Sequence, residues 1–319
     1  MIVRWGLGEL QRVLGELGIE RPYVIASERW SKLDLPEFGR WREVPSDRIA
    51  EIAAEAAPAD GLLAVGGGSA IDLAKAVSAE TGLPVVSVPT TYSGAEWATG
   101  FGIRNPERRM TGGGSGANLA GIVYEPELTL DLPRAESVGT ALNALAHCAE
   151  ALYVAGRNDE GDRYALAGAR DIAVSLPRVA EDGHDAAARR QLLEGAEAAG
   201  HALALAGLGL GHAMAQAIGG RYGLPHGALN AICLPAALRF NEPLAAEAVG
   251  RFAAAIGGDP VERVRELARL GGFERLRDLG VPEEDLPVLG EAAAARAGAK
   301  ANPRHASPAE VTELLRSVW

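Results

Sequence analysis

The first part of the chain alternates between short, unbroken apolar runs and longer segments whose apolar residues recur every three or four positions. The unbroken runs predict buried strands, and the recurring pattern predicts helices with one apolar face. Buried strands that alternate with helices are typical of a parallel sheet covered on both faces, so we expect an α/β lobe. The predicted strands are 22–26, 61–65 and 84–88, and the predicted helices are 6–19, 46–57 and 69–81.

Beyond about residue 134 the strand-like runs largely end, and alanine- and leucine-rich helical patterns continue through the rest of the chain. The predicted helices are 137–155, 162–180, 186–206, 211–220, 227–240 and 260–278. We therefore expect two domains, an α/β domain over 1–134 and an all-helical domain over 135–319. The glycine-rich segment 112–116 is predicted to be a mobile loop, and the alanines at 292–295 are predicted to be helical.

Composition and charge narrow the functional classes. The 319 residues are 48% hydrophobic and 23% charged, and the net charge of −11 argues against nucleic acid and anionic membranes as partners. No apolar segment has the length of a signal-peptide core or of a membrane span. The two cysteines, Cys148 and Cys233, are too few for a disulfide framework and are expected to be small buried hydrophobes. We expect a cytoplasmic protein that acts on a small molecule.

A glycine-rich turn follows the predicted strand 61–65 and opens the predicted helix 69–81. Glycines let the backbone approach a pyrophosphate, which the amide N–H groups and the helix dipole then hold. Ser69 is expected to cap the helix. Taken alone, the turn is equally a tight strand–helix connection with no ligand, and it is not the G-x-G-x-x-G fingerprint. The candidate phosphate-binding residues are Gly66, Gly67, Gly68, Ser69 and Asp72, with Lys75 one turn later.

Hydroxyl side chains gather directly after the predicted strand 84–88, in the segment 89–96. Ligands of open α/β sheets bind beyond the carboxyl ends of the strands, where Thr90, Thr91 and Ser93 could hydrogen-bond a phosphate or a ribose. The alternative is a polar loop built on Ser and Thr turns. Two such clusters at consecutive strand ends favour nucleotide binding.

Three histidines lie where their side chains could converge. Asn143 and His147 are four residues apart on a predicted helix and therefore share a face. His212 begins another predicted helix, and the loop before His226 could fold that residue back toward it. Each histidine taken alone is more simply explained as a satisfied, partly buried side chain. The remaining histidines, which show no such pattern, are His184, His201 and His305.

The set Asn143, His147, His212 and His226 is of the kind that holds a divalent cation, but it lacks an anionic oxygen. Three imidazoles and one amide make a poorer metal site than a set with a carboxylate. Glu150 lies three residues after His147, where it could orient an imidazole or simply be solvated. The residues alone leave open whether a metal is used.

These motifs, in this order over about residues 60–240, resemble the iron-containing alcohol dehydrogenase superfamily. The resemblance implies a Rossmann-like, dinucleotide-binding α/β lobe and an all-helical lobe that carries the substrate and metal site. It places the active site in the cleft between the lobes, an architecture shared with dehydroquinate synthase. It also implies a homodimer.

Within the superfamily, the stretches 89–96, 142–153 and 301–304 most resemble the maleylacetate reductase branch. Metal-dependent members carry an aspartate ligand at the position of Asn143, whereas maleylacetate reductases carry asparagine and are thought to work without a metal. Gln216 stands where metal-dependent members often carry another histidine. The stretch 211–234 resembles the alcohol dehydrogenase branch more closely.

The resemblance also implies which residues contact the nucleotide. Ser27 falls near the position where NAD-preferring relatives carry an aspartate for the ribose hydroxyl. Without that carboxylate the site need not reject a 2′-phosphate, so NAD(H) and NADP(H) both stay open. The implied contacts are the pyrophosphate on Gly67, Gly68 and Ser69, the nicotinamide side near Thr90, Thr91 and Ser93, and a further cofactor contact at Arg109.

The implied function is NAD(P)-dependent reduction of maleylacetate to 3-oxoadipate in aromatic degradation. His147, His212 and His226 would act as imidazolium donors toward an anionic substrate, with an amide hydrogen bond from Asn143. The alternative is an alcohol dehydrogenase for a small alcohol or aldehyde, in which the same histidines are neutral ligands of Fe or Zn. A lyase similar to dehydroquinate synthase and an inactive nucleotide-binding protein are less favoured. The first two hypotheses require opposite protonation states of the same residues.

Overall fold

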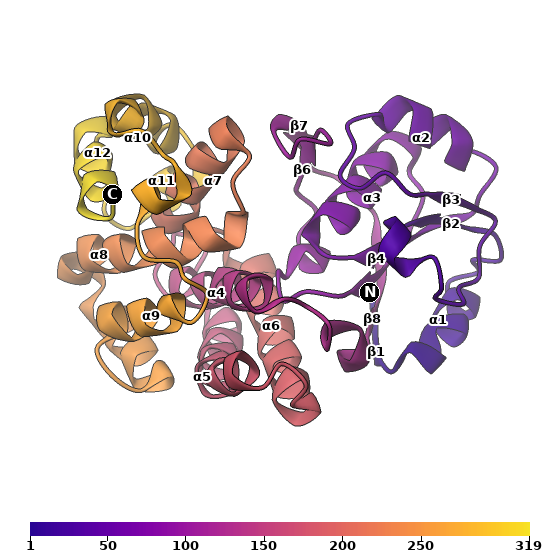
Figure 1. The fold of residues 1–319 in the computed structure, drawn as a ribbon, viewed down its shortest axis with the longest axis horizontal. Helices are drawn as coiled ribbons and strands as arrows, with labels where there is room; N and C mark the ends of the chain where they lie inside the picture. The colour runs from indigo at the N-terminus through magenta and orange to yellow at the C-terminus, as the bar shows by residue number, and fades with distance from the viewer. The chain divides into compact units, whose positions relative to one another are not determined.

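The computed structural model describes residues 1–319, which form two compact units. Unit 1 comprises Met1–Thr91 and Ala95–Thr129, and unit 2 comprises Tyr92–Gly94 and Leu130–Trp319. Every strand belongs to unit 1, and unit 2 is helical (Figure 1), so the predicted α/β lobe and helical lobe are confirmed. The segment Tyr92–Gly94 interrupts unit 1 in the sequence but clusters with unit 2.

Unit 1 is built on a six-stranded parallel sheet. In spatial order its strands are β1 (Ile2–Trp5), β8 (Leu119–Tyr124), β5 (Val85–Pro89), β4 (Gly61–Gly66), β2 (Pro22–Ile25) and β3 (Gly39–Trp41). Strands β2, β4 and β5 are buried along their whole length, as their unbroken apolar sequences predict. The sequence pattern does not predict β1, β3 or β8. Both β1 and β3 are short, partly exposed edge strands, and such strands carry a weak apolar signal.

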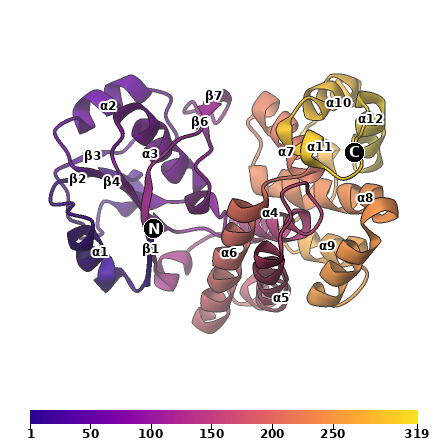
Figure 2. The same ribbon diagram turned by 180° about the vertical axis from the view of Figure 1, so that it is seen from behind.

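Helices cover both faces of this sheet (Figure 2). The helix α1 (Leu10–Glu16) shares a core with Leu63 of β4. The helices α2 (Ile49–Ala56) and α3 (Gly68–Thr81) share the opposite core with Leu62. Successive residues of a strand point to opposite faces, so β4 must be apolar at every position. The predicted two-sided burial of the sheet is therefore confirmed.

The glycine-rich segment predicted to be a mobile loop is instead a strand. Residues Met110–Gly114 form β7, which pairs antiparallel with β6 (Phe101–Arg104) in a separate two-stranded sheet. A Cβ at Gly114 would lie 2.9 Å from the Phe101 ring. The glycine there makes room for an aromatic side chain of the partner strand. The glycine-rich composition of β7 is typical of loops, so it does not predict a strand. The residues that pack in this two-stranded sheet lie on β6.

Unit 2 is assembled around one almost wholly buried helix, α4 (Arg134–Ala151), which packs against α5, α6 and α8. No strand follows β8, as predicted. None of the helices by itself combines the length and the apolar composition that a membrane span needs. The helices α6 and α7 meet those two criteria only when they are counted together, and they are bent by 100° relative to each other. The other helices are α5 (Asp159–Glu181), α6 (Ala186–Ala206), α7 (Leu210–Tyr222), α8 (His226–Ile256), α9 (Pro260–Arg269), α10 (Leu286–Ala294), α11 (Ala297–Ala301) and α12 (Pro308–Ser317).

Two helix predictions need correction. The helix predicted over 260–278 is wrong beyond Arg269, where α9 ends; Gly272 then adopts a φ of 77°, which breaks the helix. The helix predicted over 227–240 continues as α8 to Ile256, through a non-helical residue at Ala245. The alanine tract at 292–295 lies at the end of α10, which agrees with the helical prediction.

Cys148 on α4 and Cys233 on α8 are unpaired and fully buried, as predicted. Burial raises the pKa of both thiols, that of Cys233 to about 12. The thiolate is the reactive form of cysteine, so both side chains act as small hydrophobes in the core.

The first turn of α8 lies very close to α4, which yields a stability prediction. A Cβ at Gly227 would lie 2.3 Å from the carbonyl group of Gly139. We expect Gly227→Ala to lower the free energy of unfolding by about 2–3 kcal/mol, because α8 must shift away from α4. Gly250→Ala is the matched control in the same helix, since its Cβ would meet nothing within 4 Å. Urea denaturation measures both variants, and equal losses would contradict this account of the packing.

Candidate functional site

The glycine turn of unit 1 leaves the start of a helix open to an anion. Gly66 ends β4, and Gly67 precedes α3 without any side chain capping the helix. The predicted cap by Ser69 is therefore wrong, because Ser69 lies inside the first turn of α3. A Cβ at Gly67 would lie 2.8 Å from the Thr91 side chain, so this position needs glycine. The first amide N–H groups of a 14-residue helix face this turn without a side-chain partner.

The polar segment after β5 lies beside this turn. The Thr90 N–H donates to the Gly66 carbonyl (3.0 Å), and the buried Thr91 hydroxyl has no hydrogen-bond partner. Buried hydroxyls are rarely left without a partner, so the Thr91 Oγ1 atom is a group that a bound ligand could satisfy. The residues of unit 1 thus fit a nucleotide phosphate at this end of the sheet.

The topology puts the same turn at the place where open α/β sheets bind ligands. From β2 the chain passes to β3 at one edge and then returns to β4 on the other side of β2. The order of the strands therefore reverses between β2 and β4, and ligands bind beyond the carboxyl ends of strands at such a point. Ser27 follows the end of β2, and the glycine turn follows the end of β4.

Asp72 and Lys75 hold the polypeptide segment that follows β5. The Lys75 Nζ atom lies 2.7 Å from the Asp72 carboxylate and donates to the carbonyls of Ala95, Ala98 and Gly100. The Gly102 N–H also reaches the Asp72 carboxylate at 3.3 Å. The buried ammonium group is thus fully engaged by the protein. Arg109 lies beyond this segment, in the turn between β6 and β7. Its backbone N–H donates to the Asn105 side-chain oxygen there.

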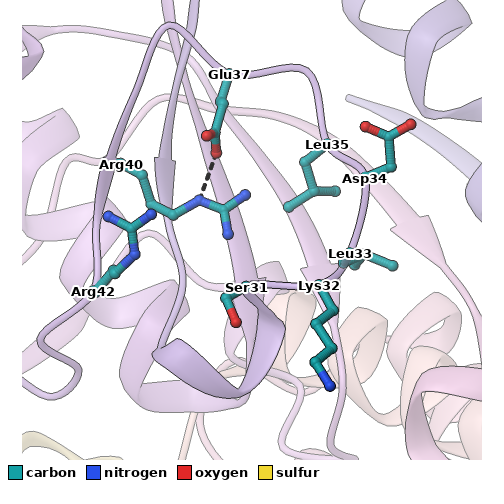
Figure 3. Close-up of a pocket in the computed structure, with 8 residues that line it drawn as sticks. All are labelled: Ser31, Lys32, Leu33, Asp34, Leu35, Glu37, Arg40 and Arg42. Atoms are coloured by element: carbon teal, nitrogen blue, oxygen red, sulfur yellow. Dashed lines mark hydrogen bonds and ion pairs between the residues drawn. The ribbon is translucent and has the colours of Figure 1, made fainter.

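Residues between Ser31 and Arg42 of unit 1 line a polar hollow of about 320 Å³ (Figure 3). Arg40 donates to Glu37 at 2.5 Å across this hollow. Arg42, directly after β3, pairs with Glu28 at 3.2 Å. The residues that line the hollow are Ser31, Lys32, Leu33, Asp34, Leu35, Glu37, Arg40 and Arg42.

In unit 2 the structure brings together the four residues predicted to converge. Asn143 and His147 lie on α4, His212 lies on α7, and His226 is the first residue of α8. The rings of His147 and His212 stack with centroids 4.7 Å apart, and the His212 and His226 centroids lie 5.8 Å apart. His147 and His212 are buried. We call these four residues the histidine cluster.

The amide of Asn143 is oriented from both ends. Its Nδ2 donates to the Ser93 carbonyl at 2.8 Å, and its Oδ1 accepts from the Asn230 amide at 2.7 Å. The His212 Nε2 atom lies 3.3 Å from the same Oδ1. Ser93 therefore serves the histidine cluster in unit 2 through its carbonyl oxygen, a contact that its prediction as a nucleotide-binding residue did not include.

Glu150 orients His212, which lies on another helix, and not its neighbour His147. Its carboxylate lies 2.6 Å from the His212 Nδ1 and accepts the backbone N–H groups of Gly209 and His212. Both ring nitrogens of His212 thus face oxygen acceptors, Glu150 on one side and Asn143 on the other. The Glu150 carboxylate is an acceptor, so the His212 Nδ1 carries the hydrogen of that hydrogen bond.

The environment of His147 disfavours the charged form of its ring. Burial holds the pKa of His147 well below its ordinary value, and the nearby His212 and His226 lower it further. Its Nδ1 is buried without a hydrogen-bond partner. The hypothesis that all three histidines are cations is therefore wrong for His147, which is neutral near pH 7.

Asn230 belongs to the site and was not predicted. Its amide bridges the Asn143 Oδ1 and the His226 Nε2, which lies 3.0 Å away. Asn230 follows His226 by four residues on α8, the same spacing as Asn143 and His147 on α4. That repeated spacing is the sequence signal that could have found it.

Comparison with known proteins decides the family. The profile of the iron-containing alcohol dehydrogenase family matches residues 6–120, and that of the C-terminal region of the Fe-containing alcohol dehydrogenase family matches residues 137–319. The chain belongs to the iron-containing alcohol dehydrogenase family. It is therefore an oxidoreductase of a family whose motifs the sequence resembles.

Individual members of the family give the same assignment. Maleylacetate reductase 1 from Cupriavidus pinatubonensis is 36% identical over 86% of this chain and 82% of its own length. Maleylacetate reductase from Pseudomonas knackmussii is 34% identical over 98% of this chain and 93% of its own. The crystal structure of maleylacetate reductase from Agrobacterium tumefaciens superposes with a TM-score of 0.88 at 28% identity, covering 100% of this chain and 95% of that one.

The family name implies iron, so the cluster can be tested for its fit to a metal. The cluster offers three imidazoles and no carboxylate oxygen. Asn143 contributes an amide oxygen that is already a hydrogen-bond acceptor. No three His, Cys, Asp or Glu side chains are arranged so that they could hold a metal ion together. The residues present do not fit a divalent cation.

Gln216, at the position where metal-dependent members often carry another histidine, faces elsewhere. Its side-chain oxygen accepts from Arg296 at 3.4 Å, and its carbonyl accepts from the same guanidinium group. The histidines outside the cluster are also accounted for. His201 stacks on Tyr164 with ring centroids 4.3 Å apart, His184 is exposed, 4.0 Å from Asp131, and His305 is also exposed.

The lowered pKa of His147 predicts how stability depends on pH. The unfolded chain protonates this histidine below about pH 6.5, whereas the folded chain resists protonation, so stability should fall as the pH drops below that value. The slope contributed is at most about 1.4 kcal/mol per pH unit. Urea denaturation across this range should show a shallower pH dependence for His147→Gln than for the wild type. The exposed control His184→Gln should keep the wild-type slope, and equal slopes in all three proteins would contradict the assignment.

Proposed function

We propose that this protein is a maleylacetate reductase that uses NADH or NADPH to reduce maleylacetate to 3-oxoadipate. One observation carries the proposal: a neutral amide, Asn143, lies at the centre of the three histidines and is held by hydrogen bonds on both sides. Relatives named maleylacetate reductase, at 36% and 34% identity, support the same substrate. The proposed catalytic residues are His147, His212, His226 and Asn143.

The histidine cluster suits an anionic substrate. In the proposed mechanism His212 acts as an imidazolium donor toward the substrate, and Glu150 on its far side holds the ring in place. Neutral His147, whose Nε2 lies 3.5 Å from the Asn143 amide nitrogen, has an unpartnered Nδ1 that can donate a further hydrogen bond. Fixed donors in a buried site stabilise negative charge without having to reorganise, which is the main way that proteins lower such barriers. A dicarboxylate is thus bound and its developing negative charge is stabilised.

The reduction needs a hydride and a proton. When bound, the reduced nicotinamide supplies the hydride. His212 can donate its Nε2 proton and recover the neutral form while Glu150 keeps the Nδ1 proton in place. His226, which is only partly buried, connects the cluster with solvent for reprotonation.

The pyrophosphate of the nucleotide would be held by unit 1. The open first turn of α3 would bind the pyrophosphate, and the unpartnered Thr91 hydroxyl would bind nearby. The proposed nucleotide-binding residues are Gly66, Gly67, Gly68, Ser69, Asp72, Thr90, Thr91, Ser93 and Arg109. We also propose that the protein is a cytoplasmic homodimer, as its family resemblance implies.

Steady-state kinetics with and without a chelator test the function. We expect oxidation of reduced nicotinamide with maleylacetate, insensitive to chelator, and at least about a hundredfold less kcat/KM with simple aldehydes. Asn143→Asp places a carboxylate in the cluster and removes the donor to the Ser93 carbonyl, so this variant should bind Zn²⁺ or Fe²⁺ and lose maleylacetate activity. Asn241→Asp, at a buried asparagine outside the cluster, controls for a new buried charge. Activity that needs a metal in the wild type would overturn the proposal.

A metal-dependent alcohol dehydrogenase is the second candidate, and one observation favours it. The hydrogen bond from His212 to a buried carboxylate is the arrangement that commonly supports a metal-bound imidazole. A neutral His147 is also the form that binds metals. Metal analysis of the purified protein, with alcohol oxidation before and after adding Fe²⁺ or Zn²⁺, separates the two candidates.

The residues at the end of β2 favour acceptance of NADPH. Ser27 carries no charge, and the Arg42 guanidinium group lies nearby, paired with Glu28. A carboxylate at position 27 itself would repel a 2′-phosphate, whereas Arg42, if it exchanged Glu28 for the phosphate, would attract it. We infer that NADPH is used at least as well as NADH.

Ser27→Asp should reverse this preference. We expect the ratio of kcat/KM for NADPH to that for NADH to fall about tenfold or more, because like charges are brought together. Ser317→Asp adds the same charge at an exposed position of unit 2 and should leave the ratio unchanged. An unchanged ratio in Ser27→Asp would show that the ribose of the adenosine lies elsewhere.

A further inference from the structure

A fully buried arginine in unit 2 has no acidic partner. Arg189 on α6 is 1% exposed, and none of its hydrogen-bond acceptors is a carboxylate. A guanidinium group buried without an anion is costly unless every N–H group is satisfied. Because burying this guanidinium group costs free energy, the groups that it contacts indicate its role in the protein.

All five N–H groups of Arg189 have an acceptor. The Nε group donates to the Gly183 carbonyl at 2.8 Å, and Nη2 donates to the carbonyls of Leu130 and Leu132. Nη1 donates to the Ser137 hydroxyl at 2.7 Å and to the Tyr92 hydroxyl at 3.1 Å. The guanidinium group therefore holds segments that are distant in the sequence.

Tyr92 connects this arginine to the histidine cluster. It is the first residue of Tyr92–Gly94, which we call the strap. The Tyr92 side chain is fully buried, and its N–H lies 3.3 Å from the Thr140 hydroxyl on α4. One residue later, the Ser93 carbonyl accepts from the Asn143 amide at 2.8 Å.

The next residue of the strap packs against another member of the cluster. Gly94 has a φ of 72°, and a Cβ there would lie 3.4 Å from the His147 Nδ1. The strap thus touches Asn143 through a carbonyl and His147 through a glycine. A shift of the strap would rotate the Asn143 amide, whose other end lies near His212.

We propose that Arg189 is a positioning residue of the histidine cluster, which anchors the strap by the Tyr92 hydroxyl so that the Ser93 carbonyl orients Asn143. The inference rests on the proposed function only for its kinetic consequences. The orientation of the cluster is a property of the protein that can be measured without a substrate.

Two variants separate this role from a purely structural one, because each removes one acceptor from the same Nη1 atom. Tyr92→Phe releases the strap, and Ser137→Ala releases a hydroxyl on α4 that is not part of the strap. Ser137 also donates to the Leu132 carbonyl at 3.1 Å, so its loss removes two hydrogen bonds from the same region. Arg189→Lys, which keeps the charge but offers fewer donors, completes the set.

We expect Tyr92→Phe to lower kcat with maleylacetate by about tenfold and to leave the KM for reduced nicotinamide within about twofold. Ser137→Ala should lower the melting temperature as much or more and leave kcat unchanged. In NMR spectra of the substrate-free proteins, the ring-nitrogen signals of His147 and His212 should shift in Tyr92→Phe and Arg189→Lys but not in Ser137→Ala.

Unshifted histidine signals in a folded Tyr92→Phe protein would overturn the inference, as would equal shifts in Ser137→Ala. If Arg189→Lys does not fold, the comparison of Tyr92→Phe with Ser137→Ala still tests the inference. A wild-type protein without reductase activity would contradict the proposed function while the NMR comparison still tests the anchor.

Discussion

The need to satisfy polar groups on a buried helix underlies the candidate site. Almost every residue of α4 from Ser137 to Ala151 is buried, yet one stripe of this helix carries Asn143, His147 and Glu150. Polar groups in such an environment must find partners within the protein, because leaving them unpaired is costly. Their partners come from α7, α8 and the strap, so the requirement for hydrogen bonds brings these elements to one point.

The same requirement gives the histidines different characters. Glu150, held by two backbone N–H groups, accepts from the His212 Nδ1. Burial, together with the nearby His212 and His226, lowers the pKa of His147 and keeps this ring neutral near pH 7. A neutral imidazole avoids the cost of burying a charge without a counter-ion. The site therefore combines an imidazole paired with a carboxylate and a neutral imidazole.

Much of the fold could be predicted from the sequence because its signal is local. The unbroken apolar runs of β2, β4 and β5 and the periodic segments of unit 2 identify buried strands and helices directly. The errors share one cause. In β7 the packing residues lie on the partner strand, and α9 ends before a glycine with positive φ in a segment that still has helical composition. Neither feature is encoded in the periodicity of the segment itself.

The candidate site also has features that the sequence predicts and features that it does not. The sequence by itself determined the family, the glycine turn and the spacing that places Asn143 and His147 on one face of α4, because these depend on residue type and short-range geometry. Only the tertiary structure decided that Glu150 serves His212, that Asn230 joins the cluster and that Arg189 anchors the strap. The decisive contacts join residues far apart in the sequence: Glu150 and His212 by 62 positions, Asn143 and Asn230 by 87, and Tyr92 and Arg189 by 97. Such contacts depend on how the helices pack, and short-range sequence patterns do not specify that packing.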